Sequence, residues 1–279
     1  MKIFICANEE QSIPAKVSRT LLIEQEFISS ESIEIIYEKD FSELTNFFGQ
    51  KFLRSGAWET FEKDDLQRFT LLRFKVPELM NYKGLALVLD PDIFIIQNKL
   101  PELFNRIKTH KLLCRKGIRS NSYASSLMLL QCDLLKDWNL ENFINELKDG
   151  RLDYEDLINL RNCDDNIGIL EDFWNDFDRL NKNTIFLHTT QKITQPWRKG
   201  LELNSYIPPL FGFLKRDLIY KILHKPLRIG VEHPIDDINQ VFFKGLNKAI
   251  TSGQISSEEI DEAIKKGFLR IDIHSKIKK

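Results

Sequence analysis

The chain has 279 residues, of which 42% are hydrophobic and 29% charged, a composition typical of a soluble globular protein with a sizeable core. Its formal net charge of −1 provides no overall attraction to nucleic acid, so we expect no nucleic-acid partner. No segment approaches the roughly 18 consecutive apolar residues of a membrane-spanning helix. We therefore expect a cytoplasmic protein without a transmembrane segment, and peripheral membrane attachment stays open.

The first part of the chain alternates strands and helices. Apolar runs predict strands over 3–7, 33–37 and 85–89. Helical spacing predicts helices over 12–26, 41–53 and 66–80, the last of them bent or interrupted at Pro77. This alternation is the signature of a mostly parallel sheet with helices on both faces.

The pattern becomes less regular after residue 92. Strands are expected over 112–114, 126–131 and 184–187. Helices are expected over 101–110, 140–147 and 154–160, and the chain is predicted to be helical from Leu210. Ser256 and Glu259 form a capping box for a last helix. The sequence shows no repeat and no linker, which favours one domain with two lobes.

Two acidic residues one position apart, Asp90 and Asp92, follow a run that is typical of a buried strand. An unpaired buried carboxylate costs several kcal/mol, so such a group needs a proton, hydrogen bonds or a cation. Residues i and i+2 of an extended chain point to the same side, and Pro91 holds Asp90 in the extended region. The pair is therefore expected to face a divalent cation. The alternative is an Asp-Pro turn with both acids in water.

Three predicted strands end in polar groups. Asn8 and Glu9 follow the strand over 3–7, Asp90 and Asp92 follow the strand over 85–89, and His188 follows the strand over 184–187. Ligands of open α/β sheets bind outside the carboxyl ends of strands, which predicts a site here. Carboxylate oxygens with one imidazole nitrogen suit manganese better than calcium.

Six short segments occur in order along most of the first two hundred residues. They are 3–10, 69–79 with Arg73, the D-x-D at 90–92, 123–130, 154–159 and 188–197. In this order they resemble the motifs of family-8-type glycosyltransferases with the GT-A fold. The resemblance implies an α/β protein with a central, mostly parallel mixed sheet flanked by helices and a helical C-terminal region.

The resemblance also implies a function. It indicates a metal-dependent, retaining glycosyltransferase that moves a sugar from a nucleotide-diphosphate sugar, UDP-sugar above all, to a carbohydrate, glycolipid or protein acceptor. The residues alone do not distinguish retention from inversion. The cation would be Mn²⁺ or Mg²⁺, held by Asp90, Asp92 and His188. One GT-A domain over 1–279 would comprise a nucleotide-sugar-binding lobe (1–96), an acceptor and metal-completing lobe (97–210) and a helical extension (211–279).

Further residues take roles from the same resemblance. Donor contacts are expected from Ala7, Asn8, Glu9, Arg73, Asp90, Asp92, Lys192 and Arg198, and catalytic roles from Glu155 and Asp156. The chain also departs from the family pattern. Tyr154 and Glu155 replace the first Asp and the Gln of D-Q-D. In the last motif, Gln191 and Thr194 replace the Gly and the Lys, so the phosphate-binding Lys cannot be assigned by position.

Three other functions compete with this hypothesis. A D-x-D phosphatase would use Asp90 as nucleophile and Asp92 as acid/base, but such enzymes prefer Thr or Val where this chain has Phe94. A nucleotidyltransferase would need a Gly-rich loop to hold phosphates, and residues 8–14 contain no Gly. A non-catalytic nucleotide-sugar-binding protein is supported only by the altered D-Q-D segment.

Overall fold

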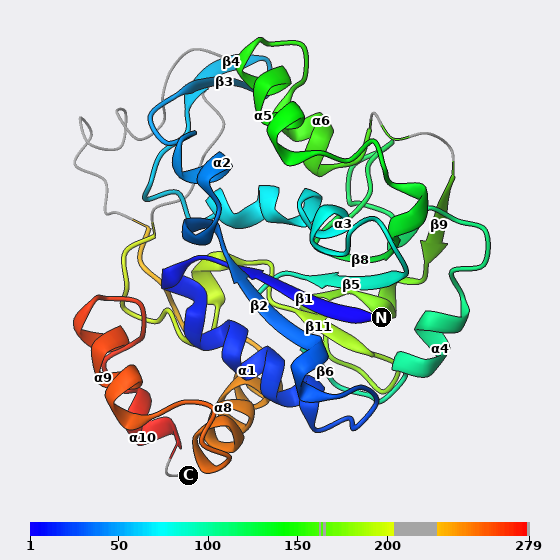
Figure 1. The fold of residues 1–279 in the computed structure, drawn as a ribbon. Helices are drawn as coiled ribbons and strands as arrows, with labels where there is room; N and C mark the ends of the chain where they lie inside the picture. The colour runs from blue at the N-terminus through cyan, green and yellow to red at the C-terminus, as the bar shows by residue number, and fades with distance from the viewer. Residues whose placement is uncertain (162, 164–165, 204–227, 278–279) are drawn as a thin grey trace.

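The centre of the fold is a six-stranded mixed sheet in the order β2-β1-β5-β8-β7-β9 (Figure 1). The structure is a computed structural model that describes residues 1–161, 163, 166–203 and 228–277. The strands are β1 (Lys2–Ala7), β2 (Ile33–Tyr37), β5 (Leu85–Leu89), β7 (Leu112–Arg115), β8 (Leu127–Gln131) and β9 (Ile167–Leu170). Neighbouring strands are parallel except that β8 is antiparallel to both β5 and β7. The predicted mostly parallel mixed sheet is confirmed.

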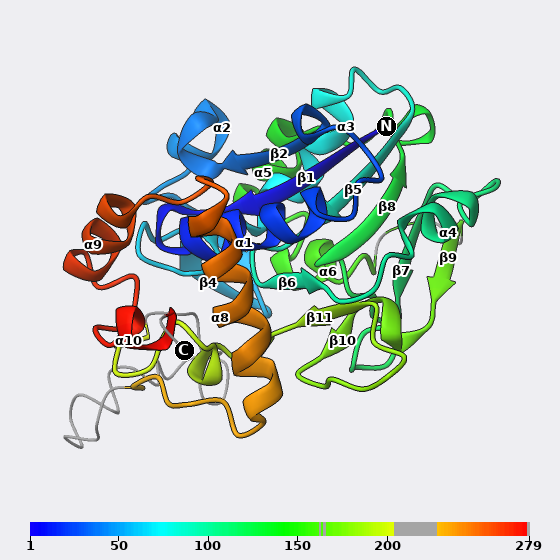
Figure 2. The same cartoon turned by 90° about the horizontal axis from the view of Figure 1, so that it is seen from below.

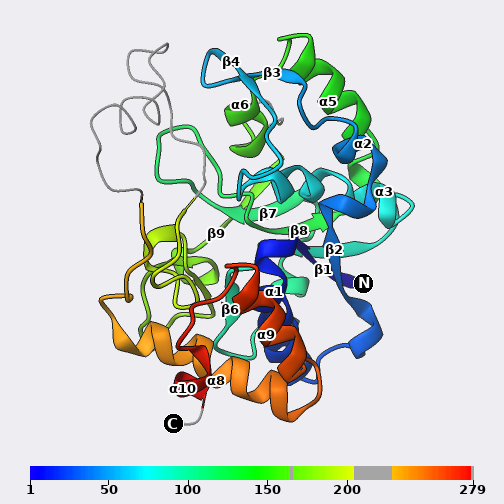
Figure 3. The same cartoon turned by 90° about the vertical axis from the view of Figure 1, so that its left-hand side faces the viewer.

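Helices cover both faces of this sheet (Figures 1 and 3). In β1, Ile3 and Ile5 point to one face and Phe4 and Cys6 to the other, as the two-residue period of a strand requires. The first face packs against α1 (Ser12–Ile23) and α8 (Asp236–Thr251). The second face packs against the 3₁₀ helix η4 (Arg68–Phe74), α5 (Leu140–Lys148) and α6 (Tyr154–Ile158). Burial on both faces explains why the central strands are almost wholly apolar.

A small second sheet joins the end of β5 to a distant part of the chain. Its strands are β10 (Asp176–Phe177), β11 (Phe186–His188) and β6 (Ile93–Ile95), and Figure 2 shows them beside the main sheet. β11 pairs with β6 in antiparallel register, with His188 opposite Ile93. The amide of Thr189 also donates to the carbonyl of Asp92 at 3.1 Å. This pairing brings His188 beside the D-x-D segment.

One predicted helix is wrong, and a second is interrupted as expected. Instead of a helix over 41–53, α2 spans only Ser42–Thr45 and is followed by a hairpin of β3 (Lys51–Arg54) and β4 (Ala57–Thr60). The apolar residues of this region form an aromatic cluster, in which the rings of Phe47 and Phe61 stack at 4.4 Å. The helix predicted over 66–80 is present as two pieces, η4 and a short α3 (Val76–Leu79). Pro77 lies in the first turn of α3, the part of a helix that tolerates proline, and the interruption falls just before it.

The remaining helices lie where helical structure was predicted. They are α4 (Leu100–Asn105), α9 (Ser257–Lys265) and α10 (Ile273–Ile277), and α9 begins with the predicted capping box of Ser256 and Glu259. However, α4 ends at Asn105 rather than at residue 110, and α10 follows the helix that was predicted to be the last. Of the stretch predicted to be helical from Leu210, residues 210–227 lie outside the described residues. Residues 228–235 are not helical, contrary to the prediction, and the helical part begins with α8 at Asp236. Within the described parts of the chain, every helix is too short or too polar to span a membrane. The division into lobes stays a prediction.

Candidate metal and donor site

Three buried side chains converge where the two sheets meet. Asp90 and Asp92 follow β5, and His188 ends β11. Each offers one ligand atom, and these atoms all lie within 4.8 Å of one another. The Asp90 amide donates to the carbonyl of Ser126 at 2.9 Å, which prolongs the β5–β8 pairing beyond the strand. The structure thus brings together the three residues predicted as metal ligands.

Asp92 has one oxygen that is hydrogen-bonded and one that is not. Its Oδ2 accepts from Nε2 of Gln195 at 2.7 Å. Its Oδ1 is buried, accepts no hydrogen bond from the residues described, and lies 3.3 Å from Nε2 of His188. A buried carboxylate oxygen without a donor is costly unless it meets a cation. Two carboxylates and one imidazole are a fitting donor set for Mn²⁺ or a similar ion.

Asp90 is held by Arg73 of η4. The guanidinium donates to both carboxylate oxygens, with Nε 2.9 Å from Oδ1, and its Nη1 donates to Oγ of Ser125 at 2.7 Å. Burial raises the pKa of the Asp90 carboxyl, and Arg73 opposes that rise. Arg73 was predicted to contact the donor, but the structure assigns its hydrogen bonds to Asp90 and Ser125.

The segment after β11 supplies two cationic groups for which the described residues show no ion pair, Lys192 and Arg198. Arg198 is buried, its Nε donates to Oε1 of Gln195 at 2.7 Å, and its Nη2 makes no hydrogen bond within the described part of the chain. Burial lowers the pKa of Arg198 to about 10. Burial lowers the pKa of Lys192 to about 8, with Asp65 opposing and Arg198 adding to the shift. A buried cation such as Arg198 and a partly buried one such as Lys192 are suited to bind an anion.

Glu155 and Asp156 are neighbours on α6 but have different partners. Glu155 pairs with Nε of Arg54 at 3.3 Å, and Arg54 also pairs with Asp65 at 3.1 Å. Asp156 pairs with Arg161 at 2.8 Å and lines a separate cavity of about 340 Å³. Among the described contacts, none joins Asp156 to the three predicted ligands.

The α6 segment is nevertheless linked to Asp90. Oγ of Ser125 donates to the carbonyl of Ile158 at the end of α6, and the same oxygen accepts from Arg73. Arg73 in turn holds Asp90. Arg54, which orients Glu155 and stacks on Tyr154 at 4.4 Å, was missed by the sequence reasoning because it lies about a hundred residues away from α6.

The residues after β1 are occupied by contacts within the chain. Ala7 is the last residue of β1 and pairs with Tyr37. Asn8 accepts from the Gln11 amide at 3.1 Å and donates to the carbonyl of Leu66 at 3.1 Å. Glu9 pairs with Lys266, just after α9, at 2.8 Å, and this hydrogen bond lowers the pKa of Glu9. The side chain of Glu9 therefore points toward the C-terminal helices.

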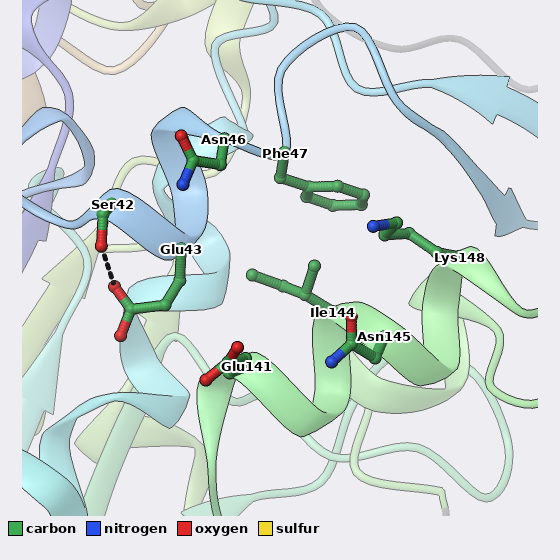
Figure 4. Close-up of a pocket in the computed structure, with 8 residues that line it drawn as sticks. All are labelled: Ser42, Glu43, Asn46, Phe47, Glu141, Ile144, Asn145 and Lys148. Atoms are coloured by element: carbon green, nitrogen blue, oxygen red, sulfur yellow. Dashed lines mark hydrogen bonds between the residues drawn. The ribbon is translucent and has the colours of Figure 1, made fainter.

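A polar pocket between α2 and α5 is separate from this site (Figure 4). It measures about 300 Å³, and Glu43, Glu141 and Lys148 are among the residues that line it. Lys75 pairs with Glu43 at 2.6 Å, and this hydrogen bond lowers the pKa of Glu43. No buried polar atom without a partner lies among its lining residues, so the pocket carries no indication of a ligand.

Comparisons of sequence give no relative. No protein-family model matches the chain, and no curated protein sequence matches it significantly.

Comparison of structures identifies the fold. The galactosyltransferase LgtC, solved with donor and acceptor sugar analogues, is 11% identical, with a TM-score of 0.50 over 71% of this chain and 89% of that one. The glycosyltransferase GlyE of Streptococcus pneumoniae TIGR4 is 13% identical, with a TM-score of 0.51 over 96% of this chain and 64% of its own. The bifunctional glycosyltransferase WbbM is 9% identical, with a TM-score of 0.53 over 95% of this chain and 51% of its own. The chain thus spans about half of WbbM and under two thirds of GlyE. These likenesses show the GT-A fold, as the sequence predicts.

Proposed function

We propose that this protein is a glycosyltransferase that depends on a divalent cation and uses a nucleotide-diphosphate sugar, with UDP-sugar as the expected donor. The observation that carries the proposal is the convergence of Asp90, Asp92 and His188. Lys192 and Arg198, two cations whose charges interact with Asp92, show no ion pair with any described residue. We infer transfer with retention at the anomeric carbon from the family that the motifs resemble. The acceptor class, whether carbohydrate, glycolipid or protein, is left open.

Each side chain has a distinct task in this proposal. Asp90, Asp92 and His188 would hold Mn²⁺ or Mg²⁺, which when bound stabilises the negative charge that the diphosphate gains as the glycosidic bond breaks. Lys192 and Arg198 would bind the diphosphate oxygens. Because the side chains of Asn8 and Glu9 have partners, donor contacts at Ala7, Asn8 and Glu9 would use backbone atoms.

Glu155 is proposed to stabilise positive charge on the sugar as the leaving group departs, as a carboxylate does in glycosidases. Its ion pair with Arg54 orients it and leaves its second oxygen available to a ligand or to Asn159, whose Nδ2 lies 3.4 Å away. The role of Asp156 stays a sequence-based prediction. Cytoplasmic location also belongs to the proposal, and the buried thiols of Cys6, Cys114 and Cys132 support it because thiols persist in reducing compartments.

The phosphatase alternative is disfavoured by the contacts of Asp90. A nucleophilic carboxylate needs an oxygen free to attack, whereas both oxygens of Asp90 accept hydrogen bonds from Arg73. A non-catalytic nucleotide-sugar-binding protein would have the same site, so only turnover separates it from an enzyme.

A thermal-shift screen of nucleotide sugars, with and without Mn²⁺, tests the proposal. A ligand at about 100 times its Kd stabilises the native state by about 2.7 kcal/mol. We expect one nucleotide sugar to raise the melting temperature only when Mn²⁺ is present, and the Asp92→Ala variant to lose both this shift and donor hydrolysis. Absence of any shift, or full activity in chelator, would contradict the proposal, and binding without turnover would favour the non-catalytic alternative.

A further inference from the structure

Among the three predicted metal ligands Asp90, Asp92 and His188, His188 is the residue whose ligand atom depends on which ring nitrogen carries the proton. A neutral imidazole carries its proton on Nδ1 or on Nε2, and only a nitrogen without a proton can bind a cation. Nε2 of His188 faces Asp92, whereas Nδ1 faces Oδ1 of Asn175 at 3.0 Å and, at the longer distance of 3.4 Å, Oγ of Ser126. The identity of the atom that Asn175 offers to Nδ1 therefore decides whether Nε2 is a ligand.

Asn175 is held from several directions. It is fully buried between the 3₁₀ helix η6 (Asp172–Trp174) and β10. Its backbone carbonyl accepts from Nη1 of Arg115 at 2.7 Å, and its backbone amide donates to the carbonyl of Asp172 at 3.0 Å. Its Nδ2 donates to Oγ of Ser126 at 3.0 Å. With the backbone and the amide nitrogen fixed, Oδ1 is directed at Nδ1 of His188.

We propose that Asn175 is a positioning residue that keeps the proton of His188 on Nδ1 and so presents the lone pair of Nε2 to a divalent cation. The inference rests on the cation site of the proposed function. Hydrogen bonding of the second ring nitrogen to an oxygen acceptor is the usual way in which proteins orient a histidine ligand. The ring of Phe177, whose centroid lies 5.3 Å from that of the imidazole and whose plane is at 82° to it, limits rotation of the His188 ring.

A rotated Asn175 amide gives the competing arrangement. In that case Nδ2 would donate to Nδ1 of His188, Oγ of Ser126 would donate to Oδ1, and Nε2 would carry the proton and donate to Asp92. The contact between Nε2 and Asp92 Oδ1 does not support this arrangement. At 3.3 Å the two atoms make no hydrogen bond, and Oδ1 has no donor among the described residues. Two acceptor atoms that face each other in this way are what a shared cation requires.

Nitrogen NMR of the metal-free protein distinguishes the two arrangements directly. Two-bond ¹H–¹⁵N correlation spectra report which ring nitrogen of each neutral histidine is protonated, and the His188→Gln variant assigns the His188 signal. We expect Nδ1 of His188 to be protonated and Nε2 to be bare in the wild-type protein. A proton on Nε2 would overturn the proposal.

Two variants of matched size test the role of Asn175 in binding Mn²⁺. Asn175→Asp keeps an oxygen acceptor for Nδ1 and should bind Mn²⁺ at least as tightly as the wild-type protein. Asn175→Leu removes the nearer acceptor and leaves Nδ1 only the longer contact with Oγ of Ser126, so it should bind Mn²⁺ about 10–100-fold more weakly, with the His188 proton shared between the two nitrogens. Unchanged Mn²⁺ affinity and an unchanged tautomer in Asn175→Leu would refute the proposal.

The test of Asn175 does not depend on which nucleotide sugar the protein binds. If Asn175→Leu fails to fold, the tautomer of His188 in the wild-type protein and the Mn²⁺ affinity of Asn175→Asp still test the role of Asn175. If these results are as expected but no nucleotide sugar binds, the positioning role of Asn175 stands and only the proposed donor chemistry fails.

Discussion

Replacing Arg73 by Met should destabilise the protein strongly and in a manner that depends on pH. The two side chains of the Arg73–Asp90 pair are each 8% exposed, and the guanidinium donates to both carboxylate oxygens. Removing one partner of such a buried pair leaves an uncompensated charge and costs about 3–5 kcal/mol. Because Arg73 opposes the rise in the pKa of Asp90, its loss raises that pKa further.

The sign of the pH effect follows from this shift. A carboxyl whose pKa is higher in the folded than in the unfolded protein binds protons more tightly when folded, so stability is retained at acidic pH and falls as pH rises through the folded pKa. The free energy of unfolding from urea titrations should therefore differ more between variant and wild type at about pH 8 than at about pH 5.

Arg161→Met is the matched control. Its ion pair with Asp156 is about a third exposed and contributes no more than about 1 kcal/mol. Mn²⁺ should restore part of the stability of Arg73→Met, because a cation bound by Asp90, Asp92 and His188 would also compensate the negative charge of Asp90. The reasoning would be refuted if Arg73→Met lost as little free energy of unfolding as Arg161→Met, or if its loss did not depend on pH.

Three further predictions concern single groups. Calorimetry should show the wild-type protein losing donor affinity above about pH 8, where Lys192 deprotonates, whereas the Lys192→Arg variant should retain its affinity there. Parallel pH profiles of the two proteins would count against a diphosphate role for Lys192. Glu155→Gln should keep donor binding while turnover falls about 10²–10³-fold, and unchanged turnover would exclude Glu155 from catalysis. Arg270 is fully buried and holds the pKa of Glu232 at about 2, below the ordinary 4.5, so this pair stabilises the fold above about pH 4 and less as pH falls toward about 2. Arg270→Leu should flatten that part of the acid-unfolding curve, and an unchanged curve would show that the pair contributes nothing.

Much of the fold was predictable because its signals are local. The boundaries of β2 and the capping box of α9 agree with the sequence, since strand alternation and capping depend on neighbouring residues. The hairpin of β3 and β4 was not predictable from helical spacing, because the apolar residues involved pack into an aromatic cluster instead. β9 was missed because it is short and contains Gly168.

The candidate site was predictable only in its outline. Asp90, Asp92 and His188 could be grouped because the sequence predicts each of them at the carboxyl end of a strand. The structure places these strand ends in two different sheets, β5 in the main sheet and β11 in the small one, which meet at this point. Gln195 and Asn175 have no local signature, since their partners Asp92 and His188 are defined only by the fold. Glu155 and Asp156 were given a common role, although consecutive residues on a helix point about 100° apart. Their separate partners, Arg54 and Arg161, follow from that angle.

The central claim is that Asp90, Asp92 and His188 together hold a divalent cation. Electron paramagnetic resonance of Mn²⁺, titrated onto the wild-type protein and onto the Asp92→Asn and Asp156→Asn variants, measures this directly. The account predicts a single site in the wild-type protein and in Asp156→Asn, and its loss in Asp92→Asn. Equal Mn²⁺ binding by all three proteins, or none by the wild type, would contradict it.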